Sequence, residues 1–298
     1  MTARALPLSL TVLAATAWAG ATVLTKVALH ELAPLELLGL ELSSSAFVML
    51  CLLAVRGRPF LPERWAVFAL LGVLEPGLSF GLFDFGLSRT GAADGAILIA
   101  SQSLFGVLLA RVLLGERVSA VTRAAVAVGF AGSVLVGLAE SGHGTSLEGD
   151  LLVLAASLAA AANGVGVRRL SGETDTLAAT TTQLVAAALV VAPVVAVSNG
   201  GSVGVDGVDS AHLAAAIATG LLGGAVPFLA FNRAIRDLTV AHAGLVLNLI
   251  PVLAAAAAVV ALGERLHWPE IVGGALVVGA ATSAAAMVGR GGSEAPCT

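Results

Sequence analysis

Residues 176–197 read TLAATTTQLVAAALVVAPVVAV and contain no charged side chain. A run of about 20 such residues is long enough to cross a lipid bilayer as a helix. The rest of the chain has the same character, because 58% of its 298 residues are hydrophobic and only 11% are charged. Soluble domains contain about one quarter charged residues. The sequence therefore predicts an all-α integral membrane protein that is surrounded mainly by lipid.

Similar apolar runs follow one another along the chain, separated by short polar breaks. The longest breaks, 140–149 and 198–210, are rich in Gly, Ser and Asp, which is typical of solvated turns. We therefore expect ten transmembrane helices and no soluble domain, although a cleaved signal peptide is an alternative for the first span. The predicted spans are Leu6–Ala28, Pro34–Val55, Trp65–Leu87, Ala92–Leu114, Ala120–Ala139, Asp150–Val167, Thr176–Val197, Ala211–Phe231, Val240–Leu262 and Trp268–Met287.

The charged residues predict an orientation. Of the 15 Lys and Arg residues, only Lys26, Arg89 and Arg265 fall on one side of the predicted membrane. Positively charged loops stay in the cytoplasm, so we expect both termini there and the protein in the cell membrane.

Composition and motifs also exclude several classes of protein. The net charge is -4 and no basic patch is present, which argues against a nucleic-acid partner. The chain has no Walker A phosphate-binding loop. Its two cysteines, Cys51 and Cys297, provide no disulfide or metal framework. We expect no cofactor and no metal.

The chain contains two similar halves. Gly115-Glu116-Arg117 closes the fourth predicted span, and Gly263-Glu264-Arg265 closes the ninth, 148 residues later. The third span of each half contains a proline, Pro76 or Pro227, and the fifth span carries small residues at every fourth position. The shared order and spacing favour a duplication. At the same spacing Phe83-Asp84 matches Phe231-Asn232, and the small residues are Ala125, Gly129, Ser133 and Gly137 in one half and Ala275, Gly279 and Ser283 in the other.

Five spans are an odd number, so the second copy must enter the membrane in the opposite sense. Inverted repeats are typical of secondary transporters, whose substrate site lies near the middle of the membrane between the repeats. We predict a first five-helix repeat over 1–139, a loop over 140–149, a second, inverted repeat over 150–289 and a cytoplasmic tail over 290–298.

Several motifs make the chain resemble the EamA-type branch of the drug/metabolite transporter superfamily over nearly its whole length. The resemblance implies two inverted five-helix repeats and the export or exchange of amino acids or other small metabolites. Where the family commonly has an arginine in the second helix, this chain has Glu41. The motifs are Trp18-Ala19-Gly20 with Lys26-Val27-Ala28-Leu29, Leu108–Arg117, and Asn248-Leu249-Ile250-Pro251 with Leu262-Gly263-Glu264-Arg265.

Glu75 lies near the centre of the third span, directly before Pro76. A carboxylate at mid-membrane costs roughly 2.5–3.5 kcal/mol, so it usually faces a cavity or a partner. Pro76 has no N–H, which frees the carbonyl group of Gly72 one turn earlier. Together they predict a polar notch that suits a cation, a proton or an amine. The alternative is a structural carboxyl group that burial keeps neutral.

Two further carboxylates, Glu41 and Asp84, are predicted nearer the extracellular side. Each is a candidate for substrate binding, with interfacial or interhelical hydrogen bonding as the alternative. Nine residues separate Glu75 from Asp84, which places them on opposite faces of an ideal helix. They can line one cavity only if a kink at Pro76 rotates the outer part of the helix.

Two amides and two prolines extend the candidate site. Gln102 in the fourth span and Asn248 in the ninth can each donate and accept hydrogen bonds, which suits a zwitterionic or polar ligand. Pro227 and Pro251 are candidate helix breaks, like Pro76. Paired breaks in corresponding spans point to the binding site of a transporter. Packing kinks and interhelical hydrogen bonds are the competing interpretations.

Trp18 lies inside the first span, whereas Trp65 and Trp268 begin spans as interfacial anchors do. Its ring could stack on a substrate, or it could only pack against neighbouring helices. The other intramembrane polar residues are interpreted as helix-packing groups, and the Gly-Glu-Arg triads as helix-end charges and loop anchors. These packing groups are Asn163, His242 and Thr180-Thr181-Thr182-Gln183.

The sequence thus predicts a secondary transporter that moves a small organic solute by alternating access, with Glu75 exchanging a proton. A membrane-embedded enzyme is the first rival, but it would need a nucleophile with a base or a metal cluster, and no catalytic residue is identified. A non-transporting scaffold or sensor is the second rival, but it would want a soluble output domain. A homodimer through the small-residue faces is left open.

Overall fold

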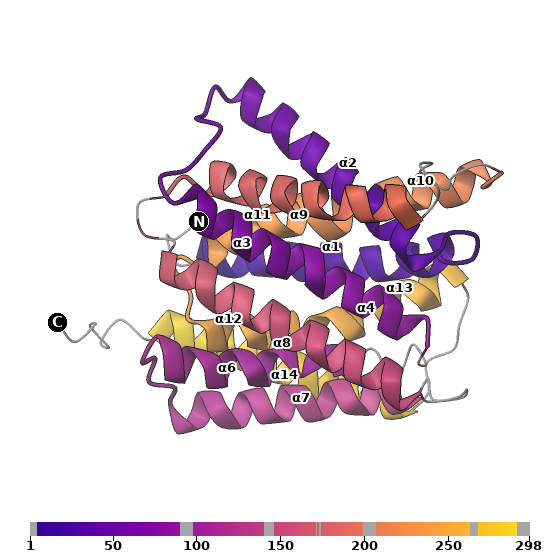
Figure 1. The fold of residues 1–298 in the computed structure, drawn as a ribbon. Coiled ribbons are helices and arrows are strands. Elements are labelled where there is room, and N and C mark those ends of the chain that lie inside the picture. The colour runs from indigo at the N-terminus through magenta and orange to yellow at the C-terminus, as the bar shows by residue number, and fades with distance from the viewer. Residues whose placement is uncertain are drawn as a thin grey trace.

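The computed structural model describes residues 5–89, 98–139, 146–170, 172, 174–198, 207–262 and 268–290. Over these ranges the chain forms a bundle of helices that run back and forth along one direction (Figure 1). The elements are α1 (Ala5–Ala28), α2 (Pro34–Val55), α3 (Trp65–Gly72), η1 (Val73–Leu78), α4 (Ser79–Leu87), α6 (Gln102–Leu113), α7 (Ala120–Ala139), α8 (Leu147–Leu170), α9 (Thr176–Ser198), α10 (Ser210–Thr219), η2 (Gly220–Ala225), α11 (Val226–Ala234), α12 (Val240–Leu247), α13 (Leu249–Leu262) and α14 (Trp268–Arg290).

The described helices coincide closely with the predicted spans. Six of them are long and apolar enough to cross a membrane when consecutive pieces are joined, and four are shorter apolar helices. The fourth predicted span begins outside the described residues, and its described helical part starts at Leu98. The predicted tail also lies outside them, apart from Arg290, which ends α14. The count of ten spans and their inversion stay predictions.

Two helices are interrupted at matching places in the two halves. In η1, Glu75 has φ −150° and ψ 122°, which is an extended conformation. Proline disfavours the helical conformation of the residue before it and cannot donate a helical hydrogen bond, so the helix breaks there. In η2 the turns widen directly before Pro227, which lies in the first turn of α11. Both irregular segments lie in the spans where the sequence predicts breaks, but only η1 contains a residue with a non-helical backbone, whereas η2 stays helical with wider turns.

Glycines allow helices from the two halves to approach closely. A β-carbon added at Gly72 of α3 would lie 2.1 Å from the carbonyl oxygen of Gln183 in α9. One added at Gly86 of α4 would lie 2.9 Å from the carbonyl oxygen of Gly149 in α8. Small residues at such contacts are typical of helix packing in membranes. The helices of the two halves therefore pack with their backbones in close contact.

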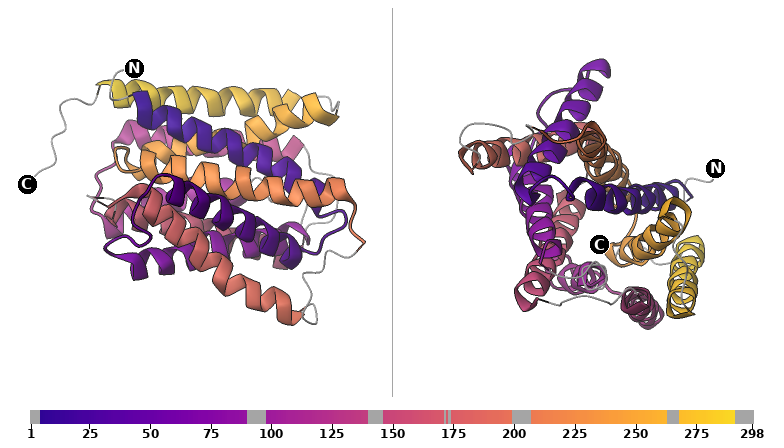
Figure 2. Two further views of the ribbon diagram at one scale, coloured as in Figure 1. Left: turned by 90° about the horizontal axis from the view of Figure 1, so that it is seen from above. Right: turned by 90° about the vertical axis from the view of Figure 1, so that its right-hand side faces the viewer.

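The helices α7 and α14 pack against each other at the edge of the bundle, as Figures 1 and 2 show. A β-carbon at Gly132 would lie 2.7 Å from the carbonyl oxygen of Gly273, so the backbones are close. Gly129 and Ser133 of the α7 small-residue face are buried inside the chain, whereas Gly279 of α14 is exposed. Much of the small-residue face of α7 that was considered for a homodimer therefore packs against helices of the same chain.

Candidate substrate-binding cavity

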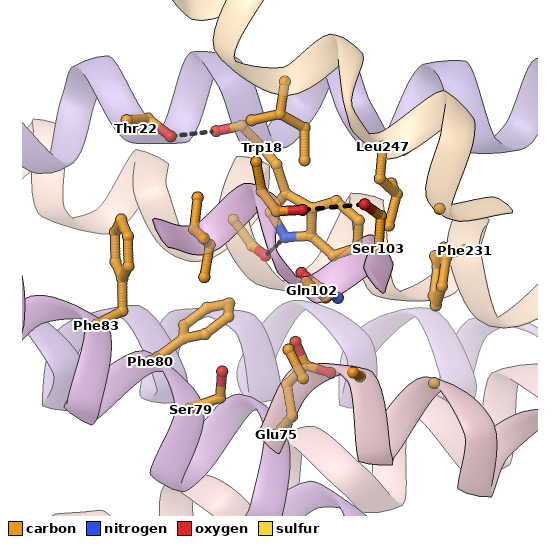
Figure 3. A pocket seen from close by; sticks show the side chains of 18 of the residues that line it. Trp18, Thr22, Glu75, Ser79, Phe80, Phe83, Gln102, Ser103, Phe231 and Leu247 are labelled. Atoms are coloured by element: carbon orange, nitrogen blue, oxygen red, sulfur yellow. Dashed lines mark hydrogen bonds between the residues drawn. The ribbon is translucent and has the colours of Figure 1, made fainter. Parts of the chain in front are cut away.

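A cavity of about 160 Å³ lies between the helices of the two halves (Figure 3). Its walls come from α1, α2, η1, α4, α6 and the residues before it, α8, η2, α11, α12 and α13. The six residues predicted to bind substrate all line it, and so does Pro251. Pro76 and Pro227 do not line it but lie in or beside the broken segments η1 and η2. The six residues are Trp18, Glu41, Glu75, Asp84, Gln102 and Asn248.

Trp18 is fixed by the break in the second half. Its indole Nε1 donates a hydrogen bond of 2.8 Å to the carbonyl oxygen of Gly223. Pro227, four residues further on, has no N–H to bond this carbonyl group. The rings of Phe228 and Phe231 meet the indole edge-on, each with its centroid 5.8 Å from that of Trp18. The indole therefore has a structural role and also faces the cavity (Figure 3).

Glu75 begins a chain of buried hydrogen bonds. Its Oε2 accepts from Asn163 Nδ2 at 2.8 Å, and Asn163 Oδ1 accepts from Gln183 Nε2 at 3.0 Å. Gln183 Oε1 in turn accepts from Asn232 Nδ2 at 2.7 Å, and the same Nδ2 contacts Thr180 Oγ1 at 3.0 Å. The other four residues of this chain, Asn163, Gln183, Asn232 and Thr180, are at most 2% exposed. We call these five residues the amide chain.

The amide chain has a direction. Each amide N–H₂ group donates toward Glu75, whose carboxylate can only accept when it is ionised. Buried hydrogen bonds polarise one another, and in this chain the Glu75 carboxyl group is the final acceptor. The chain links η1 of the first half to α8, α9 and α11 of the second. Sequence reasoning assigned Asn163 and Gln183 to packing; the signal for them was a polar side chain in the middle of an apolar span.

Glu41 and Asp84 form a second polar region of the cavity. Both are buried, with 5% and 3% of their surface exposed, and they interact electrostatically. Thr25 donates to Glu41 Oε1 at 3.4 Å. Asp84 Oδ2 is buried and has no hydrogen-bond partner among the described residues.

The break at Glu75 explains how Glu75 and Asp84 face the same cavity. An uninterrupted helix would place them on opposite faces. The extended conformation of Glu75 changes the rotation of α4 relative to α3, and both carboxyl groups line the cavity. The sequence predicted that the two residues could line one cavity only if a kink at Pro76 rotated the outer part of the helix. The structure has this change of direction.

Gln102 and Asn248 lie at helix ends. Gln102 is partly exposed and points into the cavity at the start of α6 (Figure 3). Asn248 separates α12 from α13, so the ninth predicted span is interrupted there. It is 2% exposed, and its Nδ2 has no hydrogen-bond partner among the described residues.

One end of the bundle is held together by the first Gly-Glu-Arg triad. Glu116 Oε1 lies 3.4 Å from Arg168 Nε, and Glu116 Oε2 accepts from the backbone N–H of Val240 at 3.3 Å. Arg168 also donates to the carbonyl oxygens of Ile235, at 3.2 Å, and Arg236. These contacts tie the end of α6 to α8 and to the turn between α11 and α12. We call them the Glu116 clamp. They fit the anchoring role expected for the triad.

Comparison with known proteins agrees with these features. The sequence profile of the EamA-like transporter family matches residues 5–138 and, a second time, residues 147–284. The chain belongs to the EamA-like transporter family. This family is part of the drug/metabolite transporter superfamily, and its membership agrees with the long apolar helices in making the chain a multi-pass membrane protein. Among the described residues no group of His, Cys, Asp and Glu has the arrangement of a metal site.

Three relatives are each 30% identical to this EamA-family chain. One is a WAT1-related chloroplast protein of Arabidopsis thaliana, which matches 61% of this chain. Another is a probable terminal-alkyne amino-acid exporter of Streptantibioticus cattleyicolor, which matches 65% of this chain. The alignments span 44% and 64% of these two relatives, respectively. An uncharacterized protein of Pseudomonas aeruginosa matches 96% of this chain and is itself covered over 97%.

A solved crystal structure has the same fold. It superposes with a TM-score of 0.80 over 96% of this chain and 99% of its own, at 21% sequence identity. At this identity the similarity shows the fold alone.

Proposed function

We propose that this protein is a secondary transporter that carries a small organic solute, such as an amino acid or a related compound, out of the cell by alternating access. The main support is the cavity, which both family-matched halves line and which contains the predicted binding residues. Cavities between two repeats are the substrate sites of secondary transporters. The relative named as an amino-acid exporter supports the choice of solute and direction.

In this proposal the cavity walls recognise different parts of the solute. Gln102 and Asn248 supply hydrogen bonds to its polar groups. The carboxyl groups supply negative charge, and the aromatic rings of Trp18 and Phe80 supply apolar surface. Few polar groups in a mostly apolar cavity are typical of small-molecule sites.

Alternating access requires each end of the cavity to open in turn. The Glu116 clamp closes one end by joining α6 of the first half to α8 and α11 of the second. Rocking of the halves toward the opposite arrangement would break these contacts. The broken segments η1 and η2 lie beside the cavity and are natural places for this change in helix angle.

Glu75 is proposed to exchange a proton during the cycle. The substitution Glu75→Gln keeps the shape of the side chain and removes its proton exchange. Uptake driven by an imposed pH gradient should fall to the level of empty liposomes, while the variant stays folded. Exchange of labelled for unlabelled solute should persist, because it needs no net proton movement. Glu63→Gln, at an exposed loop residue, should behave as the native protein. Undiminished pH-driven uptake in Glu75→Gln would remove this role.

The transport function itself is tested by counterflow. The purified protein in liposomes preloaded with an unlabelled solute should accumulate the same labelled solute transiently. A panel of amino acids and related amines provides the candidates. Counterflow of at least one compound supports the proposal. Absence of counterflow for every compound that binds the purified protein would favour a non-transporting scaffold or sensor.

A further inference from the structure

The charge of the cavity lining is unbalanced. Three lining residues carry carboxyl groups, Glu41, Glu75 and Asp84, and no described lining residue is Lys or Arg. Glu75 has a dedicated partner in Asn163. Of the other two, Asp84 has a buried oxygen, Oδ2, without a hydrogen-bond partner among the described residues.

One oxygen of the buried Asp84 carboxyl group lacks a hydrogen bond within the described part of the chain. Its Oδ2 has no partner among the described residues, although the residue is only 3% exposed. Glu41 has two threonine hydroxyl groups as partners, Thr219 and Thr25, and the bond from Thr25 is long, at 3.4 Å. Buried polar groups are normally satisfied, and an exception calls for a missing partner. Asp84 lines the cavity, so a ligand bound there lies next to its carboxyl group and can supply that partner after a small shift of the side chain.

The two carboxyl groups also repel each other when both are charged. A cation in the cavity that both residues line would reduce this repulsion and could donate hydrogen bonds to a carboxyl group. A hard metal ion would want about six oxygen ligands, and the described residues show no metal cluster. An ammonium group needs only a few acceptors, because it carries three N–H donors.

Aromatic rings accompany the carboxyl groups in the cavity wall. Phe83 and Phe80 precede Asp84 on α4, and Trp18 faces them across the cavity (Figure 3). Aromatic faces attract cations and also accommodate apolar groups. The lining therefore matches a molecule with a positively charged nitrogen and an apolar body.

We propose that Glu41 and Asp84 bind a positively charged nitrogen of the solute, so that the substrates are organic amines, including amino acids that dock through their ammonium group. This proposal rests on the proposed transport function and names its substrate class.

The test uses three probes of similar shape and different charge: 2-phenylethylamine, 2-phenylethanol and phenylacetate. Binding to the purified full-length protein is measured by calorimetry at pH 7. We expect the amine to bind at least about tenfold more tightly than the alcohol and the acid. Asp84→Asn and Glu41→Gln should each weaken amine binding by about tenfold or more, while circular dichroism shows that the variants are folded. Glu63→Gln is the matched control and should bind as the native protein does.

Several results would overturn the proposal. Equal affinity for the three probes would do so, as would an amine preference that survives in both variants. Preferred binding of phenylacetate that disappears in Lys26→Gln would show that the only lysine of the chain sets the charge of the site. Binding and transport are separable: amine binding without counterflow contradicts the transport function alone. Counterflow of a solute without amine preference contradicts this inference alone.

Discussion

Pro227 and Trp18 illustrate how single residues shape the cavity. The proline leaves the carbonyl group of Gly223 without its helical partner, and a buried carbonyl group without a partner costs about 1–3 kcal/mol. The indole N–H of Trp18, 205 residues earlier in the chain, satisfies it. One side chain thus stabilises a helix break and lines the site at the same time.

We expect Trp18→Phe to destabilise the protein by about 1–3 kcal/mol, because it keeps an aromatic ring but leaves the Gly223 carbonyl group unsatisfied. Unfolding in detergent, followed by circular dichroism, measures the change. Trp65→Phe is the control, since Trp65 is 50% exposed and begins α3, and its unfolding should match the native protein. A Trp18→Phe variant as stable as the native protein would show that the hydrogen bond contributes little.

At the scale of the elements, glycines set the distance between helices of the two halves. We expect Gly72→Ala to destabilise the protein by about 1–3 kcal/mol or more, because its methyl group would collide with the backbone of Gln183 in α9. The same shift would disturb the amide chain, to which Gln183 belongs. Gly279→Ala is the matched helical control, as no heavy atom lies within 4 Å of an added β-carbon there. Equal unfolding of both variants would contradict the close α3–α9 contact.

The Glu116 clamp predicts how one end of the cavity opens. In a background with Cys51→Ser and Cys297→Ser, the cavity substitution Val240→Cys reports access for a water-soluble thiol reagent. Adding Arg168→Gln should speed its labelling by roughly fivefold or more, because the closed arrangement loses about 1 kcal/mol or more relative to the open one.

Arg233→Gln is the control for this experiment. Arg233 pairs with Asp237 within its own turn, at 2.7 Å, and both side chains are about half exposed. Labelling in this variant should stay at the native rate. Equal acceleration by Arg233→Gln and Arg168→Gln would point to a general effect of charge and not to the clamp.

For the whole molecule, the decisive expectation is the opposite orientation of the halves. Reporters fused after Arg117 and after Arg265 should fall on opposite sides of the membrane, with Arg117 in the cytoplasm. Fluorescent protein and alkaline phosphatase fusions in a bacterial host measure this. Activity of the same reporter at both positions would refute the inverted arrangement.

Much of the fold was predictable because helix length and burial in lipid depend on local composition. The boundaries of α2 and α7, for example, coincide with the predicted spans. The irregular segments at Pro76 and Pro227 were predictable as well, since a proline inside a helix removes a backbone hydrogen bond, although Pro193 lies inside α9 without such a segment. The sequence also nominated six residues that line one cavity, because polar groups in apolar spans are costly and need a polar environment.

The amide chain shows where prediction from the sequence ended. Asn163, Gln183 and Asn232 lie on three different helices, and as isolated polar residues they could equally have been packing groups. Their contact with one another and with Glu75 depends on how each helix is rotated about its axis. A local sequence pattern does not predict this rotation. The same holds for the contact between Glu116 and Arg168.

By itself, then, the sequence determined that the protein resides in a membrane, where its helices run and which costly polar groups they carry, because these follow from the local balance of apolar and polar residues. The tertiary structure alone decided that Glu75 and Asp84 face one cavity, that Trp18 caps a carbonyl group of the other half and that an amide chain joins the halves. The physical reason is that helix rotation is set by packing between residues far apart in the chain, where a glycine or a proline changes which faces meet.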